Sequence, residues 1–264
     1  MSCIFGRTSC NVFLLLFLLA PVLASPNDDL LKATESGNPV AVKAALSARA
    51  DVNATEKEGT RSTALMIASA ENFPEIVQIL LLSKAKVNVK DLSNSTALMY
   101  AAENNSFTIV KMLIEAGADV NTQGGISNYT ALMHAVQHDN AEIIGLLLKA
   151  KAAVNLSGQQ GQTALALATG GDKSRIVEML IAAGANVNAS NREGFTPLQI
   201  ASAEGKTEIA GLLIKAKANI NARTRNNDTA LIWAAQNGHA DVAKLLLKAK
   251  ADPEIKDKSG KTAL

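Results

Sequence analysis

Few residues in this chain have the types and spacing that catalysis, metal binding or phosphate binding requires. His134 and His138 are four residues apart and would share one face of a helix, a spacing at which two imidazoles can hold a metal ion. Two ligands do not complete a metal site, and no cysteine lies near them. Gly-Lys-Thr occurs at Gly205 and Gly260, but a phosphate-binding loop needs a further glycine upstream, where both copies have isoleucine. The sequence therefore predicts a protein that is not an enzyme, with no catalytic residue, no metal and no cofactor.

The first 24 residues have the pattern of a secretory signal peptide. Arg7 precedes an apolar run from Val12 to Ala20, and Val22 and Ala24 occupy the small-residue positions of a cleavage site. The apolar run is too short to span a bilayer. We therefore expect cleavage after Ala24 and a protein located in the periplasm or secreted.

After this cleavage the chain would have no thiol and almost no net charge. Both cysteines, Cys3 and Cys10, precede the cleavage site, so stability has to come from packing without disulfides. Removal of Arg7 leaves 25 basic against 24 acidic residues, which predicts no footprint for nucleic acid or anionic lipid. Frequent Asn-x-Ser/Thr sequons would invite heavy glycosylation in a eukaryotic secretory pathway, so we interpret them as favouring a bacterial envelope protein. The sequons begin at Asn53, Asn94, Asn104, Asn128, Asn155, Asn188 and Asn227.

Self-similarity along the chain determines the expected fold. The tripeptide Thr-Ala-Leu, once Thr-Pro-Leu, recurs at a spacing of 33 or 34 residues over most of the chain. It begins at Thr63, Thr96, Thr130, Thr163, Thr196, Thr229 and Thr262. Each complete copy is followed by a second apolar block. Such a period indicates a repeat protein in which each unit buries its apolar faces against its neighbours.

Each unit is predicted to be a helix, a turn, a second helix and a loop. Threonine is expected to cap the first helix, and Pro197 suits a first helical turn because that turn needs no N–H. The second helix carries apolar residues at helical spacing, as at Ile109, Val110 and Leu113. Within a domain at 25–264, the units are approximately 27–62, 63–95, 96–129, 130–162, 163–195, 196–228 and 229–261, with an incomplete start at 262–264. The incomplete unit at 262–264 fits either a chain end that a partner or a second copy covers, or a chain that is longer than this sequence.

These units resemble the ankyrin-repeat family. The motifs are Gly-Phe-Thr-Pro-Leu at 194–198, Gly-Ala-Asp-Val-Asn at 117–121 and Gly-Ala-Asn-Val-Asn at 184–188. The resemblance covers roughly residues 27–264 and implies an all-α solenoid of about seven helix-turn-helix units with β-hairpin-like loops. The chain departs from the family where a cation replaces the glycine that closes the second helix, at Arg49, Lys84, Lys151, Lys217 and Lys250. Glycine is preferred at this position because it has φ > 0, and a lysine held in that conformation would cost about 1 kcal/mol, so the cations leave open whether the turn keeps the geometry of the family.

The only tryptophan, Trp233, lies on the opposite side of its helix from Leu231, Ala234 and Ala235, which the stack should bury. The resemblance implies that the side of Trp233 lines a concave groove. Aromatic side chains among polar ones are typical of protein-binding hot spots, although they can also simply shield aliphatic surface. The predicted partner-binding residues are Ile67, Tyr100, Glu103, Asn104, Tyr129, His134, His138, Phe195, Ile200, Trp233, Gln236 and Asn237.

The predicted function is the binding of another protein through this groove. The resemblance implies two kinds of partner. Some exported bacterial ankyrin-like proteins are antidotes that hold a secreted enzyme inactive, for example a cell-wall hydrolase, and others support envelope enzymes of oxidative defence. We favour an inhibitor of an exported enzyme, because a chain without catalytic groups is sent to a compartment where active enzymes need control. The alternative is a passive scaffold or assembly factor.

Overall fold

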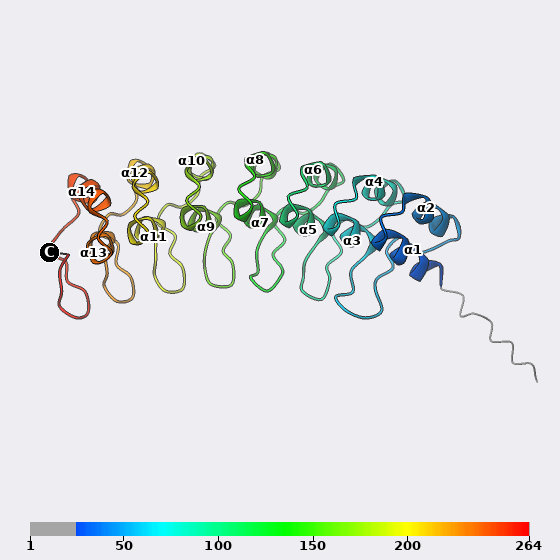
Figure 1. Ribbon diagram of the computed structural model, residues 1–264, viewed down its shortest axis with the longest axis horizontal. Coiled ribbons are helices and arrows are strands. Elements are labelled where there is room, and N and C mark those ends of the chain that lie inside the picture. Colours follow the sequence, from blue (N-terminus) through cyan, green and yellow to red (C-terminus); the bar gives the residue numbers. More distant parts are fainter. Residues whose placement is uncertain (1–24, 264) are drawn as a thin grey trace, which may run out of the picture.

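The computed structural model describes residues 25–263. The predicted signal peptide with its cleavage site, at 1–24, lies outside the described residues, as does Leu264. The described chain forms fourteen helices arranged as seven successive pairs (Figure 1). Within that range no extended strand is formed, and β-structure is limited to isolated bridges such as Gly124 with Tyr129 in the loops. The prediction of an all-α solenoid of helix pairs is confirmed.

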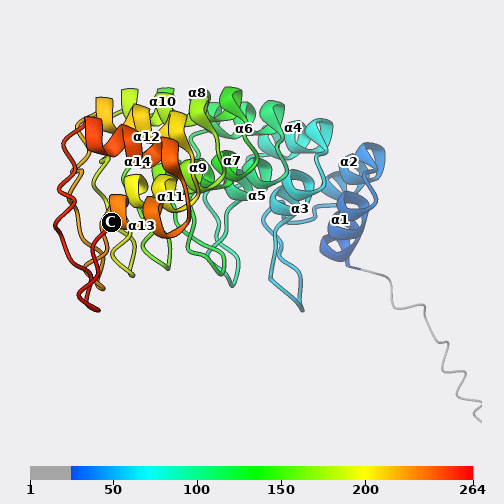
Figure 2. The same ribbon diagram turned by 60° about the vertical axis from the view of Figure 1, so that its left-hand side comes forward.

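The two helices of each pair lie in separate layers. The inner helices are α1 (Pro26–Glu35), α3 (Ala64–Ala70), α5 (Ala97–Glu103), α7 (Ala131–Gln137), α9 (Ala164–Gly170), α11 (Pro197–Ala203) and α13 (Ala230–Gln236). The outer helices are α2 (Pro39–Ser47), α4 (Pro74–Leu82), α6 (Phe107–Glu115), α8 (Ala141–Lys149), α10 (Ser174–Ala182), α12 (Thr207–Lys215) and α14 (Ala240–Lys248). The loops that join the pairs project from the inner layer, away from the outer one, in both views of the ribbon (Figures 1 and 2).

Threonine caps begin the inner helices from α3 onwards. Before α3, α7, α9, α11 and α13 the threonine hydroxyl accepts a hydrogen bond from the backbone N–H three residues on, as predicted. Thr96, before α5, is the exception, because its Oγ1 is buried without a hydrogen-bond partner. Each of these helices has only seven residues. Helices this short are unstable alone, so packing between units has to hold them.

The apolar core runs continuously between the two layers. Ile109, Val110 and Leu113 of α6 are fully buried, as their helical spacing predicts. Each inner helix packs against the inner helices of the adjacent units. Every unit therefore covers the apolar face of its neighbour, which is the physical reason for the sequence period.

One burial prediction is wrong. Ala235 is exposed, whereas Ser202 and Thr169, at the matching positions of the two preceding units, are fully buried. The difference arises because α13 is the last inner helix among the described residues, and no further helix there packs on that side.

Two ladders of hydrogen bonds join successive units. Asn53 Oδ1 accepts from the backbone N–H of Lys86 at 2.8 Å, and the asparagines that end the Val-Asn and Ile-Asn pairs of later units repeat this bond. At the loop tips, a backbone N–H of each loop donates to a carbonyl of the preceding loop, as from Gly125 to Ser93 at 2.8 Å. The two ladders fix the position of each loop relative to the next.

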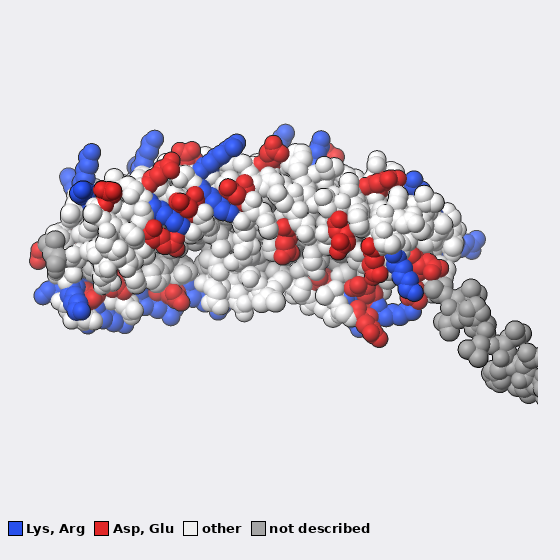
Figure 3. Space-filling model, viewed as in Figure 1, with Lys and Arg blue, Asp and Glu red and all other residues white. Residues whose placement is uncertain are grey.

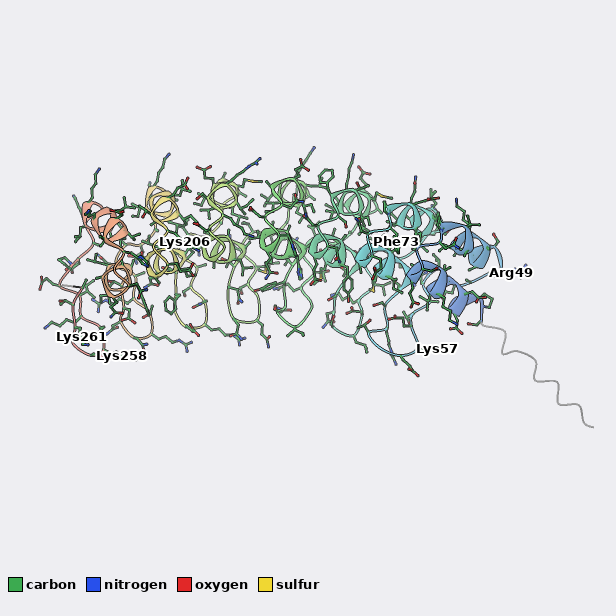
Figure 4. The ribbon with its side chains drawn as sticks, viewed as in Figure 1. Arg49, Lys57, Phe73, Lys206, Lys258 and Lys261 are labelled. Atoms are coloured by element: carbon green, nitrogen blue, oxygen red, sulfur yellow. The ribbon has the colours of Figure 1, made fainter. Side chains whose placement is uncertain are left out.

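The residue before an outer helix reaches back to the preceding unit. Lys206 Nζ donates to the carbonyl oxygen of Thr169 at 3.1 Å, and His239 Nε2 lies 3.1 Å from the carbonyl oxygen of Ala203. Figure 4 shows Lys206 and Phe73 at this place, between the two helical layers. A cation here faces the carbonyl end of an inner helix, where positive charge is favourable.

The cations that replace glycine at the ends of the outer helices keep its left-handed conformation. The five cationic residues at this position have φ between 65° and 67°: Arg49, Lys84, Lys151, Lys217 and Lys250. Gly117 and Gly184 occupy the same place in their units, with φ of 86°. The turn geometry of the family is therefore kept without its glycine.

Candidate protein-binding surface

In the middle of each inner helix from α3 to α13, one position between buried neighbours lies partly in solvent. These six half-buried residues form what we call the inner-helix row: Ile67, Tyr100, His134, Leu167, Ile200 and Trp233. The residues on either side of each along its helix are buried, as Ile232 and Ala234 are beside Trp233. The helix rotation expected from the sequence is therefore the one observed.

A hollow of about 240 Å³ opens beside this row, between α5 and α7. Its walls include Tyr100 and Glu103 of α5, His134 and Gln137 of α7, and Ile126 from the intervening loop. The remaining lining residues are Ser95, Met99, Gly124, Gly125, Ser127 and Tyr129. We call this site the Tyr100 hollow. It brings together four residues that the sequence predicts for the site, Tyr100, Glu103, Tyr129 and His134.

The phenol of Tyr100 is held by a buried carboxylate. Its hydroxyl donates to Asp91 Oδ2 at 2.6 Å, while Asp91 Oδ1 accepts from the backbone N–H groups of Ser93 and Ser95 at 2.7 and 2.9 Å. Burial, then the hydrogen bond to Asp91 and the negative charges of Asp91 and Glu103, raise the pKa of Tyr100 to about 12. Burial alone would raise the pKa of Asp91, but its hydrogen bonds from Tyr100, Ser93 and Ser95 outweigh burial and lower that pKa. The Tyr100 ring is thus fixed, with its hydroxyl proton in place, at neutral pH.

The imidazole of His134 forms the other wall of the hollow. Burial lowers the pKa of His134, the carboxylate of Glu103 partly opposes this shift, and His138 adds to it. The ring meets that of Tyr129 edge to face, with centroids 5.8 Å apart. His134 therefore presents a neutral, polar ring to the hollow at pH 7. Within residues 25–263 no three histidine, cysteine or acidic side chains gather as metal ligands do.

Tyr129, one of the predicted partner-binding residues, is buried and does not present its ring to a partner. Only 6% of Tyr129 is exposed. Its hydroxyl accepts from the amide of Gln162 at 3.1 Å, and its ring lies so close to Gly158 that a Cβ there would be 2.6 Å from it. The ring packs between consecutive loops because Gly158 leaves room for it, so Tyr129 supports the hollow as part of its floor.

Phe195 and Trp233 form a separate aromatic pair two units further along. Their ring centroids are 5.3 Å apart at an interplanar angle of 44°, and both rings are half-buried. Trp233 Nε1 is covered and has no hydrogen-bond partner within the described residues. The pair keeps a partly exposed aromatic surface, but it lies outside the Tyr100 hollow.

The other predicted residues are scattered along the solenoid. Ile67 and Ile200 are half-buried members of the inner-helix row, and Asn104 and Asn237 use their amides to satisfy the carbonyl oxygens of Tyr100 and Ala203, at 3.1 and 2.7 Å. His138 and Gln236 are exposed and line none of these features. The structure thus divides the predicted site into one hollow, one aromatic pair and isolated surface positions.

The predicted partner-binding residues do not include Ile126 or Gln137, which the structure places at the hollow. Ile126 is 94% exposed at its loop tip, and Gln137 ends α7 at the edge of the hollow. The signal for Ile126 was an aliphatic residue in a loop otherwise made of glycine, serine, asparagine and tyrosine. An aliphatic side chain in such a loop has no local reason to be there, because turns favour small and polar residues.

The hydrogen bonds at Asp91 predict a measurable effect on stability. Asp91→Asn should lower the free energy of unfolding by about 1 kcal/mol near neutral pH, because the charged acceptor for Tyr100 and Ser95 is lost. The pKa of Asp91 is lower in the folded protein than its ordinary value of 3.8, so its contribution is complete above that value and is lost as pH falls through the folded pKa. Urea unfolding should therefore show a smaller difference between native chain and variant at about pH 3 than at about pH 7. A difference that is independent of pH would contradict this account.

Stacked helix pairs with short capped inner helices define a solenoid of helical repeats, a class that presents an extended surface to other proteins. The chain belongs to the ankyrin-repeat family, since the family model described as ankyrin repeats (three copies) matches residues 30–124, 122–191 and 170–257. It is accordingly a protein–protein interaction module. No curated protein matches it in sequence. Between residues 25 and 263, none of the helices has the length and apolar character needed to cross a bilayer.

Proposed function

We propose that this protein is exported to the bacterial envelope, where it binds an exported enzyme, such as a cell-wall hydrolase, through the Tyr100 hollow and restrains its activity. The observation that carries the proposal is Ile126, 94% exposed at the rim of a hollow whose other wall is a fixed tyrosine. A large aliphatic side chain left in water beside a half-buried aromatic ring has the composition of an interface anchor point.

The chemistry of the hollow fits one anchor side chain of the partner. Tyr100 and Ile126 offer apolar contact, while the exposed carboxylate of Glu103 and the amide of Gln137 offer polar contacts. A lysine or arginine meets both conditions, with its stem along the ring and its cation at Glu103. Because Asp91 already holds the Tyr100 ring, little side-chain order has to be gained on binding. An enzyme loop anchored here would be unable to open for substrate.

Export rests on the N-terminal sequence. Cleavage after Ala24 would leave a chain that begins with Ser25, and Ser25 caps α1 by accepting from the backbone N–H of Asp28 at 3.2 Å. The cleaved chain would thus keep the cap of its first helix. The intact mass of the protein from an envelope fraction should correspond to a chain starting at Ser25, and a mass that includes residues 1–24 would overturn this route of export.

The binding test compares two variants that each remove one exposed aliphatic side chain. Ile126→Ser alters the hollow, whereas Leu82→Ser alters the end of outer helix α4, where Leu82 is 74% exposed. Both variants should unfold at the urea midpoint of the native chain, because neither side chain is part of the core. The native chain and Leu82→Ser should capture the same exported enzyme from an envelope extract and lower its turnover. Ile126→Ser should capture on the order of tenfold less.

Each other outcome has a definite meaning. Equal capture by the two variants would show that the hollow is not the binding site. Capture of an enzyme whose turnover stays unchanged would overturn restraint and favour a scaffold or assembly factor instead. Loss of capture by Leu82→Ser alone would place the binding surface on the outer helices.

A further inference from the structure

The tips of the last three described loops carry a row of exposed cations. Arg192, Arg225 and Lys258 occupy the same position in successive loops, four residues before the repeated threonine. We call these three residues the basic loop row. In the earlier loops the same position holds Gly59, Leu92, Ile126 and Gln159, so cations at this position are confined to the last three described loops.

Further cations reinforce this row. Arg223, Lys256 and Lys261 lie in the same loops and are also exposed. None of the ion pairs between described residues involves any of the six cations. Figure 3 shows blue along the lower edge at the C-terminal end, with scattered red, and Figure 4 places Lys258 and Lys261 on the last loop, at the end opposite Lys57. The near-zero net charge of the chain conceals this segregation.

Two acidic residues of these loops are used within the loops themselves. Asp228 is buried and accepts from the hydroxyl of Thr224 at 3.1 Å. Asp257 accepts from the backbone N–H groups of Ser259 and Lys261 at 2.8 and 2.9 Å. Both carboxylates therefore serve as turn acceptors, while the neighbouring cations point into solvent. Glu193, Asp252 and Glu254 are the exposed acids of the same segments.

The loop ladder fixes the spacing of the row. Arg192 donates its backbone N–H to Gln160, and Lys258 donates its own to Asn226, each at 3.0 Å. The supporting inner helices pack against each other, and packed helices lie about 8–10 Å apart. An extended chain advances about 3.3 Å per residue, so every third residue of an extended ligand would meet the next loop.

Shallow hollows lie between these loops. One of about 240 Å³ is lined by Phe195 and Arg225, and one of about 330 Å³ by Asp257 and Lys258. The first places a cation beside the Phe195–Trp233 pair, so a ligand that follows the row can also contact an aromatic ring. The row is thus a built surface of charge and hollows in register with the repeat.

We propose that the basic loop row binds an extended acidic segment of a protein partner, with one carboxylate at about every third residue. The inference rests on the proposed function only in taking the partner to be a protein, because the Tyr100 hollow is a separate surface. Attraction between the row and such a segment is electrostatic, so binding weakens as salt is added. The row also orients the partner along the solenoid, since the earlier loops have no cation at the same position.

The probe is a blocked, fluorescein-labelled peptide, Glu-Ser-Ser-Glu-Ser-Ser-Glu, titrated with the full mature chain at low salt and followed by fluorescence anisotropy. The triple variant Arg192→Gln, Arg225→Gln, Lys258→Gln should bind on the order of tenfold more weakly, as expected for three exposed charge pairs. The matched control is Lys84→Gln, Lys151→Gln, Lys217→Gln, which removes the same charge from the exposed ends of outer helices. This control should bind as the native chain does. A peptide with its three glutamates adjacent should bind more weakly than the spaced one.

Three results would overturn the proposal: no binding of the peptide, an equal loss in both triple variants, or tighter row-dependent binding of phosphatidylglycerol vesicles than of the peptide. Ile126→Ser separates this proposal from the proposed function. It should leave peptide binding unchanged while it reduces capture of the enzyme. If the native chain captures the enzyme but does not bind the peptide, this proposal alone fails. If it binds the peptide but captures no exported enzyme, the proposed function alone fails.

Discussion

Gly124→Ala should lower the free energy of unfolding by about 3 kcal/mol. A Cβ at this position would lie 2.2 Å from the carbonyl oxygen of Asn94 and 2.8 Å from the backbone nitrogen of Ser95. Both atoms belong to the backbone of the preceding loop, so relief requires movement of the loop ladder rather than of a flexible side chain. Gly124 also exchanges two backbone hydrogen bonds with Tyr129, at 3.1 and 2.9 Å, and the clash would strain both.

Urea unfolding of the full mature chain measures this effect, with Gly170→Ala as the matched control. Gly170 ends α9, and a Cβ there meets no atom within 4 Å. That substitution should raise stability by up to about 1 kcal/mol, because alanine favours helix over glycine. Because Gly124 lines the Tyr100 hollow, Gly124→Ala should also reduce enzyme capture at temperatures where the variant is folded. Equal stability of the two variants would show that the loops separate without cost.

The second large effect is a gain in stability. Replacing Lys84, Lys151 and Lys217 together by glycine should raise the free energy of unfolding by about 2 kcal/mol. Each lysine has φ near 65°, a conformation that costs about 1–2 kcal/mol for a residue with a Cβ. The greater entropy of glycine in the unfolded chain offsets part of that gain. The three sites are two units apart and share no partners, so their effects should add.

The reciprocal substitution provides the control. Gly117 holds the same turn position with φ of 86°, and a Cβ there meets no atom within 4 Å. Gly117→Lys should therefore destabilise the chain by about as much as one lysine-to-glycine change stabilises it. If the triple variant is instead less stable than the native chain, the lysine cations contribute more at the helix carbonyl ends than the backbone conformation costs.

The two proposed surfaces lie on the same stack of units, so a single partner of sufficient length can reach both. The Tyr100 hollow lies between α5 and α7, and the basic loop row lies several units further along the same rigid stack. A partner that engages both surfaces would bind more tightly than either contact allows alone, since the second contact forms within an existing complex. Losses measured for the two surfaces separately should therefore not simply sum in the full complex.

The sequence by itself determined the architecture. The spacing of 33 or 34 residues and the threonine before each short apolar segment sufficed to predict the helix pairs and their caps. All of these depend on residues close together in the chain or on the period itself. The outward rotation of Trp233 and its equivalents follows in the same way, because three and four residues return to one face of a helix.

Tertiary structure decided which loop side chains are available to a partner. Tyr129 and Phe195 hold the same position before the repeated threonine, yet Tyr129 is buried while Phe195 is half-exposed. The outcome at Tyr129 depends on Gly158, in the next loop, which leaves space for its ring. No neighbour covers Ile126 in that way. Its side chain therefore stays exposed at the rim of the Tyr100 hollow. Exposure in a solenoid loop is set by the adjacent unit, some thirty residues away, and local sequence does not contain that contact.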